Sequence, residues 1–369
     1  MSIRWGLLAA LVACGDSSAT PERDATTPKH DAGVDSSFDA APDARVLDAR
    51  THDAQVDAAS PDAALLDWES HTVTLEDEQI VIEKVGYRSQ GLLVLGQLCR
   101  PKRAGPHPVH IMNHGGFSGL SSWNGGNCAD AARNGWVAAE SSYRGEDGSE
   151  GAVEVCLGEV DDVLQLLAIV RAQPYAAAER VLMSGTSHGG CITLRALQRG
   201  APVQLAVDIF GPTDWASAHA GWKQALAQGA PQRASYEALV SALEQATGGS
   251  PEQVPEAYAV RSPLGQELRH EAPLLIVQGT ADAFVPTAQA CALADDSFVR
   301  LHVTVFGTVA ASAPAGCEGS WLPGPRPTTW PGSRYLVVYD DVGHNFEGFA
   351  TSYLIADMTS FLSDRLPGP

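Results

Sequence analysis

The chain has 369 residues, of which 24 are Lys or Arg and 44 are Asp or Glu, so its formal net charge is −20. Hydrophobic residues make up 44% and charged residues 18%, which is typical of a globular protein and excludes a disordered or fibrous one. This acidic balance argues against nucleic acid as a partner, because phosphate binding needs clustered Lys and Arg. No run of 18 or more apolar residues occurs, so no transmembrane helix is predicted.

Residues 1–14 are typical of a bacterial export signal. Arg4 precedes a short apolar run that ends in small residues just before Cys14. Residues 11–14 also resemble the bacterial lipobox, whose Cys becomes lipidated. We therefore expect an exported cell-envelope lipoprotein, at the outer membrane or cell surface, that contacts the membrane through a lipid on Cys14. The alternative is a secreted protein in which Cys14 is incidental.

Residues 15–66 form a polar tract with repeated Asp-Ala dipeptides, from Asp24-Ala25 to Asp62-Ala63. A tract with so little apolar surface is predicted to be disordered. We interpret it as a solvated tether, with an acidic partner-binding tail as the alternative. The folded domain is expected at 67–369.

The remaining cysteines fit an exported protein, in which disulfides persist. Of the 7 cysteines, six remain once Cys14 is set aside: Cys99, Cys128, Cys156, Cys191, Cys291 and Cys317. They permit up to three disulfides, and the sequence leaves their pairing open. The absence of a C-x-x-C pair argues against a zinc ribbon or a thioredoxin-type motif.

From about residue 69 the sequence alternates strand and helix patterns. The expected elements are, in chain order, strands at 79–85, 92–99, 108–112 and 136–139, a helix at 160–170, a strand at 180–183, a helix from 188, strands at 205–210, 274–277 and 335–339, and a helix at 349–362. This alternation indicates an α/β domain with a mainly parallel sheet. Sites in such sheets form at the carboxyl ends of the strands.

The most informative motif is G-x-S-x-G at 185–189, which contains Ser187. It stands between an expected strand and an expected helix, the context that a nucleophile elbow requires. The small residues permit a tight turn that lifts the Ser187 hydroxyl above the sheet. The motif alone is weak evidence in a chain with 36 Gly, but this context makes chance a poor explanation.

A serine hydroxyl needs a base and an orienting carboxylate. Asp282 and His344 each follow an expected strand, at the same sheet edge as Ser187, and the order Ser, Asp, His is that of α/β-hydrolases. We predict these three residues as the catalytic triad. Asp340 and Asp341 are rival carboxylates, but they are too close in sequence to His344 to approach its ring from behind.

An oxyanion hole needs main-chain N–H donors. One is expected from His188, which follows the nucleophile, and the other from Gly116 or Phe117, in the His-Gly-Gly segment after the strand at 108–112. The rings of His114 and His188 could act as bases. We expect their main chain to matter more, because each lies within a loop motif.

Taken in order, these motifs resemble the α/β-hydrolase superfamily, nearest to the branch of prolyl oligopeptidase catalytic domains and dienelactone-hydrolase-like esterases. The matching pieces are Pro108 with His114-Gly-Gly, Tyr143-Arg144-Gly145, Asp161-Asp162, residues 185–190, Pro212-Thr-Asp214-Trp215, Ser262-Pro263, Gly279 with Asp282 and Val285-Pro286, and Gly343-His344. The resemblance implies an α/β-hydrolase fold with a small helical cap, expected at 216–259. It also implies a serine hydrolase that needs no metal or organic cofactor.

The expected substrate follows from a departure from that branch. We expect no N-terminal β-propeller, because too few residues precede the sheet, and this favours a small-molecule ester over an oligopeptide. The expected function is hydrolysis of carboxylic esters through an acyl-enzyme. The alternatives are a peptidase acting on short peptides and a non-catalytic surface lipoprotein that uses the fold for binding.

A second departure is a long segment at 297–332, which contains Cys317, Trp321 and Trp330. It is expected to be an insertion loop that either lines the substrate site or lies on the surface, stapled by a disulfide such as Cys291–Cys317. In the cap, three aromatic residues are candidates for either core packing or substrate contact: Trp222, Tyr236 and Tyr258.

Overall fold

The computed structural model describes residues 67–120, 123, 125–268 and 270–366. The predicted signal peptide, the linker at 15–66 and the lipidation residue Cys14 lie outside the described residues. In the described part of the chain, no helix is both long enough and apolar enough to cross a membrane.

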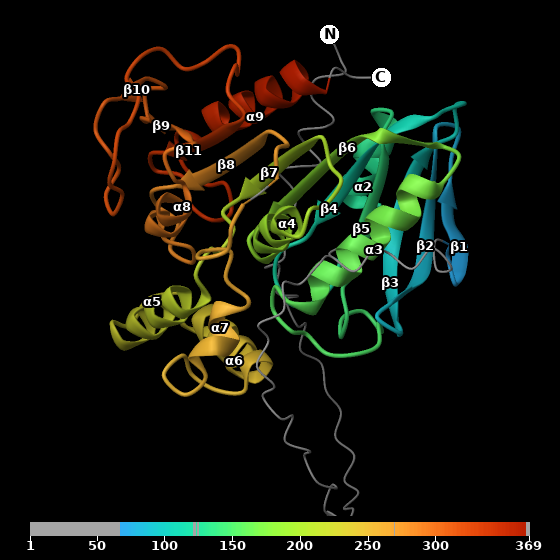
Figure 1. The fold of residues 1–369 in the computed structure, drawn as a ribbon, viewed down its shortest axis with the longest axis horizontal. Helices are drawn as coiled ribbons and strands as arrows, with labels where there is room; N and C mark the ends of the chain where they lie inside the picture. Colours follow the sequence, from blue (N-terminus) through green and yellow to red (C-terminus); the bar gives the residue numbers. More distant parts are fainter. Residues whose placement is uncertain (1–66, 121–122, 124, 269, 367–369) are drawn as a thin grey trace, which may run out of the picture.

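The domain is built on one sheet with the strand order β1-β2-β3-β5-β4-β6-β7-β8-β11-β9-β10 (Figure 1). The strands are β1 (Ser70–Glu76), β2 (Ile80–Ser89), β3 (Leu92–Pro101), β4 (His107–Asn113), β5 (Val137–Ser141), β6 (Ala176–Thr186), β7 (Leu205–Ile209), β8 (Leu274–Gly279), β9 (Val299–Val303), β10 (Val309–Ala310) and β11 (Arg334–Tyr339). The seven strands from β5 to β9 in this order pair in parallel, and antiparallel strands lie at both edges. The expected α/β class with a mainly parallel sheet is confirmed.

Helices cover both faces of the sheet, and its central strands are therefore buried on both sides. They are α2 (Gly126–Arg133), α3 (Gly158–Ala172), α4 (His188–Gln198), α8 (Thr287–Leu293) and α9 (Thr351–Arg365). Successive strand residues point to opposite faces, so Ile111 of β4 enters the core beneath α3 and α4. Met112 enters the second core, beneath α2 and α9. This burial explains why the central strands read as continuous apolar runs.

The segment between β7 and β8 forms the small helical cap expected at 216–259. It contains α5 (Trp215–Ala227), α6 (Arg233–Thr247) and α7 (Pro255–Ala259), which Figure 1 shows gathered into a lobe at one end of the domain. Asp214 begins α5, because its carboxylate accepts hydrogen bonds from the N–H groups of Ala216 and Ser217.

All six cysteines of the domain are paired in the structure. The disulfides are Cys99–Cys128, Cys156–Cys191 and Cys291–Cys317. The last pair is the one suggested for the segment at 297–332. The second pair joins the loop before α3 to α4, the helix that follows Ser187.

The expectation that 297–332 is a loop is wrong in part. Strand β9 pairs in parallel with β11, so the start of the segment belongs to the main sheet. Its two tryptophans, Trp321 and Trp330, are 5% and 3% exposed and pack into the two cores rather than facing substrate. β1, α2 and α8 were also not expected, because each is short and rich in polar or small residues.

Candidate active site

Ser187 lies on a sharp turn between β6 and α4. Its φ of 55° and ψ of −121° place a non-glycine residue in a strained conformation. The flanking glycines are obligatory, because a Cβ on Gly185 would lie 1.9 Å from the carbonyl oxygen of Gly189. A Cβ on Gly189 would in turn lie 2.0 Å from the carbonyl oxygen of Asn113 in β4. The turn therefore presents the hydroxyl of Ser187 at the carboxyl end of the sheet.

The structure brings Ser187, His344 and Asp282 into one line of hydrogen bonds. The Oγ atom of Ser187 lies 3.0 Å from Nε2 of His344, and Nδ1 of His344 lies 2.7 Å from Oδ2 of Asp282. An ionised carboxylate can only accept, so Nδ1 carries the proton and Nε2 is free to accept from the serine hydroxyl. This is the tautomer that a general base needs.

Asp282 is held by neighbours that stabilise its charge. Its Oδ1 atom accepts from the N–H groups of Phe284 and Val285, at 2.9 and 2.8 Å. Its Oδ2 atom also accepts from the amide of Gln278, at 3.2 Å. Gln278 was not singled out from the sequence, although a buried polar residue in an otherwise apolar strand four positions before the acid is the signal that could have found it.

Asp340 and Asp341, the rival candidates for the acid of the triad, make other contacts. Oδ1 of Asp340 is 2.7 Å from Nε2 of His302 on β9, and this pair fixes the sheet edge rather than the site. Asp341 has a positive φ of 56° and contacts the following loop, where its Oδ2 accepts from the N–H of Phe349. Neither interacts with His344.

The predicted oxyanion residues meet at one cavity. Gly116, Phe117, Ser187 and His188 line it together with His344. The loop after β4 comes close to the elbow at Gly115, where a Cβ would lie 2.9 Å from the carbonyl oxygen of Thr186. Only glycine permits this approach.

The rings of His114 and His188 are buried and uncharged. Burial lowers the pKa of each to about 4. The His114 ring stacks on Tyr143, with ring centroids 4.1 Å apart, and the His188 ring bonds to main-chain groups on both sides. Neither ring approaches the hydroxyl of Ser187 as a base would.

The cavity has a volume of about 650 Å³ and opens between the sheet and the cap. Aromatic side chains form much of its wall: Phe117, Trp215, Trp222 and Phe284. Of the described residues that line it, Glu347 is the only carboxylate and none is Lys or Arg. Tyr236 and Tyr258 do not line it and are buried in the cap, so only Trp222 of the three cap aromatics faces the cavity.

The cap is bonded to the loop that carries Asp282. Nε1 of Trp222 donates to the carbonyl oxygen of Phe284 at 2.8 Å. The hydroxyl of Tyr236 donates to the carbonyl oxygen of Ala283 at 3.0 Å. These two bonds fix α5 and α6 against the site.

Solved structures with the α/β-hydrolase fold resemble this domain. Acetyl xylan esterase 1 from Thermoanaerobacterium sp. JW/SL YS485 has a TM-score of 0.54 and 16% identity, over 80% of this chain and 87% of that one. The acylaminoacyl peptidase of Pyrococcus horikoshii has the same TM-score and identity, over 81% of this chain but 50% of that one. The domain therefore has the α/β-hydrolase fold.

The sequence comparisons agree. Residues 131–300 match the prolyl oligopeptidase family, a stretch that includes Ser187 and Asp282 and ends before His344. An uncharacterized peptidase of Bacillus subtilis, YtmA, is 24% identical over 229 residues, which is 62% of this chain and 83% of that protein. The chain is thus a serine hydrolase, and the alternative of a non-catalytic binding protein is set aside.

Proposed function

We propose that this enzyme hydrolyses small carboxylic esters through an acyl-enzyme on Ser187. The observation that carries the proposal is the continuous hydrogen-bonded line from Asp282 through His344 to Ser187, whose hydroxyl faces the aromatic cavity.

In the first half-reaction, Oγ of Ser187 attacks the ester carbonyl carbon while Nε2 of His344 takes its proton. Asp282 stabilises the imidazolium that forms. The N–H groups of His188 and Phe117 donate to the oxyanion of the tetrahedral intermediate. His344 then protonates the departing alkoxide, which leaves as the alcohol.

In the second half-reaction, His344 takes a proton from water, and the resulting hydroxide attacks the acyl carbon. The second tetrahedral intermediate uses the same donors. His344 returns its proton to Oγ of Ser187, and the carboxylic acid is released. The site supplies every proton transfer that the reaction needs.

The walls of the cavity favour an ester over an extended peptide. They come from α5, α6, loops, the end of β6 and the start of α4, and the described lining residues offer no free strand edge along which a peptide could pair. Peptidases use binding energy from such remote contacts to break a stable amide. An ester has a better leaving group and needs fewer of them.

A peptidase acting on short peptides is the second candidate. The match to the prolyl oligopeptidase family and the relative described as a peptidase favour it. A short peptide could place an apolar side chain among Trp215, Trp222 and Phe284 while Glu347 contacts its amino group.

A fluorophosphonate probe and a substrate panel test the function. We expect the probe to label the wild type and not Ser187→Ala, which should also lose turnover. Short p-nitrophenyl esters should be hydrolysed at least about a hundredfold faster, in kcat/KM, than di- and tripeptide amides with the same acyl side. Faster amide cleavage would favour the peptidase, and a folded wild type without label or turnover would remove both candidates.

We also propose that the enzyme is exported and anchored through a lipid on Cys14. The apolar run before Cys14 and the polar tract after it support this proposal. Metabolic labelling with a fatty-acid analogue should mark the wild type and disappear in Cys14→Ser. Label that remains in Cys14→Ser would refute lipidation at this residue and leave secretion as the alternative.

A further inference from the structure

The imidazole of His188 connects two loops that meet behind the nucleophile. Its side chain is 1% exposed. Its Nε2 atom lies 2.9 Å from the main-chain nitrogen of Cys156, and its Nδ1 atom lies 3.1 Å from the carbonyl oxygen of Gly116. The N–H of Cys156 can only donate and the carbonyl of Gly116 can only accept, so the proton of the neutral ring is on Nδ1.

The bond to Gly116 also fixes the next N–H group. The carbonyl of Gly116 and the N–H of Phe117 belong to one planar trans peptide, so they point in opposite directions. A ring that holds the carbonyl on one side therefore sets the direction of the Phe117 N–H on the other. Phe117 itself packs on the same ring, with centroids 4.8 Å apart.

We propose that the His188 side chain is a positioning residue that orients the Phe117 N–H for the oxyanion. This inference rests on the proposed serine hydrolase mechanism and deepens it. His188 then serves both sides of the oxyanion hole, because its own N–H is one donor and its ring aims the other. Between the two candidates for the second donor, the peptide geometry selects Phe117 over Gly116.

The turn that carries the N–H of Cys156, which faces Nε2 of His188, is held in place by several contacts. Val155 and Cys156 have φ values of 57° and 59°, a conformation that non-glycine residues rarely adopt. The Glu159 carboxylate, at the start of α3, keeps this turn in place. It accepts from the N–H groups of Glu154, Val155 and Leu157, at 2.6, 2.9 and 3.1 Å.

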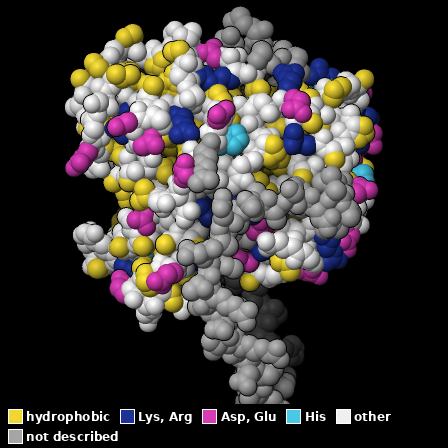
Figure 2. All heavy atoms as spheres, in the orientation of Figure 1, with side chains coloured by type: hydrophobic (Ala, Val, Ile, Leu, Met, Phe, Trp, Pro, Cys, Tyr) yellow, Lys and Arg dark blue, Asp and Glu magenta, His cyan; other side chains and the backbone are white. Residues whose placement is uncertain are grey.

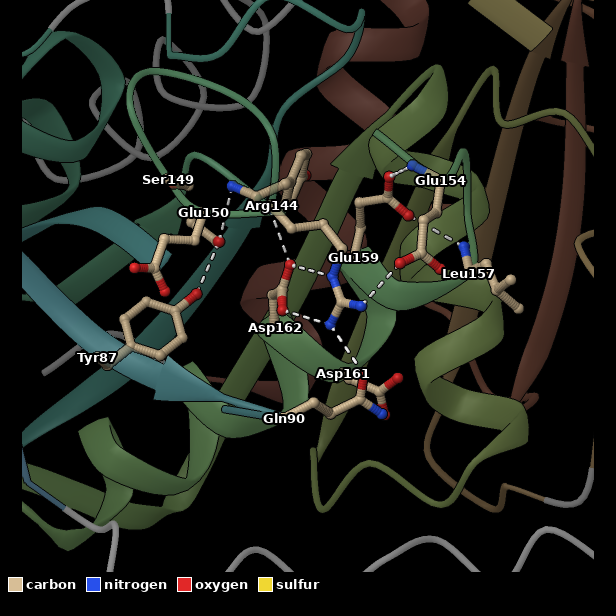
Figure 3. A network of polar contacts seen from close by, with 12 residues as sticks. Tyr87, Gln90, Arg144, Ser149, Glu150, Glu154, Leu157, Glu159, Asp161 and Asp162 are labelled. Carbon is tan, nitrogen blue, oxygen red and sulfur yellow. Dashed lines mark hydrogen bonds and ion pairs between the residues drawn. The ribbon is translucent and has the colours of Figure 1, made fainter. Parts of the chain in front are cut away.

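Two arginines complete this support. Arg144, which Figure 3 shows, is 3% exposed and bonds to both oxygens of Asp162 and to the carboxylate of Glu154 at 3.0 Å. Arg261 donates to the carbonyl oxygen of Glu154 at 2.7 Å. The disulfide from Cys156 to Cys191 then joins the turn to the helix that His188 begins. The N–H that faces His188 is therefore fixed from several directions, as an accurate hydrogen bond requires.

A matched pair of variants separates the two bonds of the ring. In His188→Asn, the amide nitrogen can replace Nδ1 and keep the bond to Gly116. In His188→Gln, the amide oxygen can replace Nε2 and keep the bond to Cys156, whereas the bond to Gly116 is lost. We expect kcat to fall about ten- to a hundredfold in His188→Gln and less than about fivefold in His188→Asn, with KM unchanged in both.

Inhibitor binding tests whether the loss of kcat in His188→Gln comes from the oxyanion hole. A boronic acid forms a tetrahedral adduct on Ser187 that places an oxygen in the oxyanion hole, so its Kd should rise in His188→Gln by the same factor as kcat falls. The product carboxylate should bind to both variants as it does to the wild type. His302→Asn, which removes a buried histidine that does not line the cavity, is the control and should keep kcat within about twofold.

Failure of the positioning role can be distinguished from failure of the proposed function. If the wild type shows no turnover that requires Ser187, both the proposed function and the positioning role of His188 are overturned. If the wild type is active, equal losses in His188→Gln and His188→Asn, or a loss of kcat with unchanged boronate affinity, would overturn the positioning role alone. Thermal melting of each variant checks that it is folded.

Discussion

Nδ1 of His344 lies 2.7 Å from Oδ2 of Asp282, and 62 residues separate the two in sequence. Because the carboxylate holds the imidazole in one tautomer, Asp282→Asn should present the wrong nitrogen to Ser187. We expect kcat to fall by about 10³- to 10⁴-fold in Asp282→Asn, measured with a p-nitrophenyl ester at neutral pH.

Asp340→Asn is the control for that variant, since Asp340 pairs with His302 instead. Its kcat should remain within about twofold of the wild type. A large loss in Asp340→Asn together with an active Asp282→Asn would reverse the assignment of the acid.

Two disulfides provide a matched comparison. Replacing Cys156 and Cys191 by Ser should lower the free energy of unfolding by about 2 to 4 kcal/mol and also reduce kcat, because this bridge holds the turn that bonds to His188. Replacing Cys291 and Cys317 should cost a similar free energy of unfolding while kcat stays unchanged. Denaturant melts and ester hydrolysis measure the two effects, and an equal loss of kcat in both would contradict the distinction.

Glu347 should give the cavity a preference for cationic substrates. It is the only carboxylate among the described lining residues, and its Oε2 atom accepts from the N–H of Asn345 at 2.9 Å. We expect a thiocholine ester to react about two- to fivefold faster, in kcat/KM, than its neutral 3,3-dimethylbutyl thioester at low salt. Glu347→Gln, which can keep the bond to Asn345, should bring the ratio to one.

High salt should reduce the same preference in the wild type, because screening weakens an exposed charge. A ratio that survives both the substitution and salt would assign the preference to the aromatic walls.

Glu146 should make stability depend on pH. Burial raises the pKa of its carboxyl to about 8, and its Oε1 atom has no hydrogen-bond partner in the described structure. The folded protein thus binds this proton more tightly than the unfolded chain, whose Glu titrates near 4.5. The free energy of unfolding should therefore fall as pH rises from about 4.5 through about 8.

Glu146→Gln removes that titration. Denaturant melts across this pH range should show a shallower fall than in the wild type, with the largest relative stabilisation above pH 8. An identical slope in both proteins would mean that other groups set the pH dependence. Asp208, Glu140 and Asp357 are also buried with pKa values raised to about 7, so some slope should remain.

The sequence predicted the parts of the site that follow strand ends. Ser187, Asp282 and His344 each follow the end of an apolar strand within five residues, and parallel strands bring their ends to one sheet edge whatever the loops do. The class and the cap were predictable for the same reason, because apolar periods reflect burial.

The contacts made by side chains across the sheet were not predictable. The His188 ring bonds to Cys156, 32 residues earlier, and nothing in either local pattern marks that bond. Strand β9 was missed because Val299 and Arg300 are only half-buried at the sheet edge, so its sequence lacks the continuous apolar run of the central strands. Which cysteines pair likewise depends on the folded arrangement of distant elements.

The bonds from Trp222 and Tyr236 to the two residues after Asp282 limit how substrate can reach the cavity. If the cap moved away from the sheet, both bonds would break, and the loop that carries Asp282 would lose two hydrogen bonds that hold it in place. An open cap and an aligned triad are therefore competing states. The triad is therefore expected to stay aligned only while these two bonds are made, so substrate and product should enter and leave the cavity without displacing the cap.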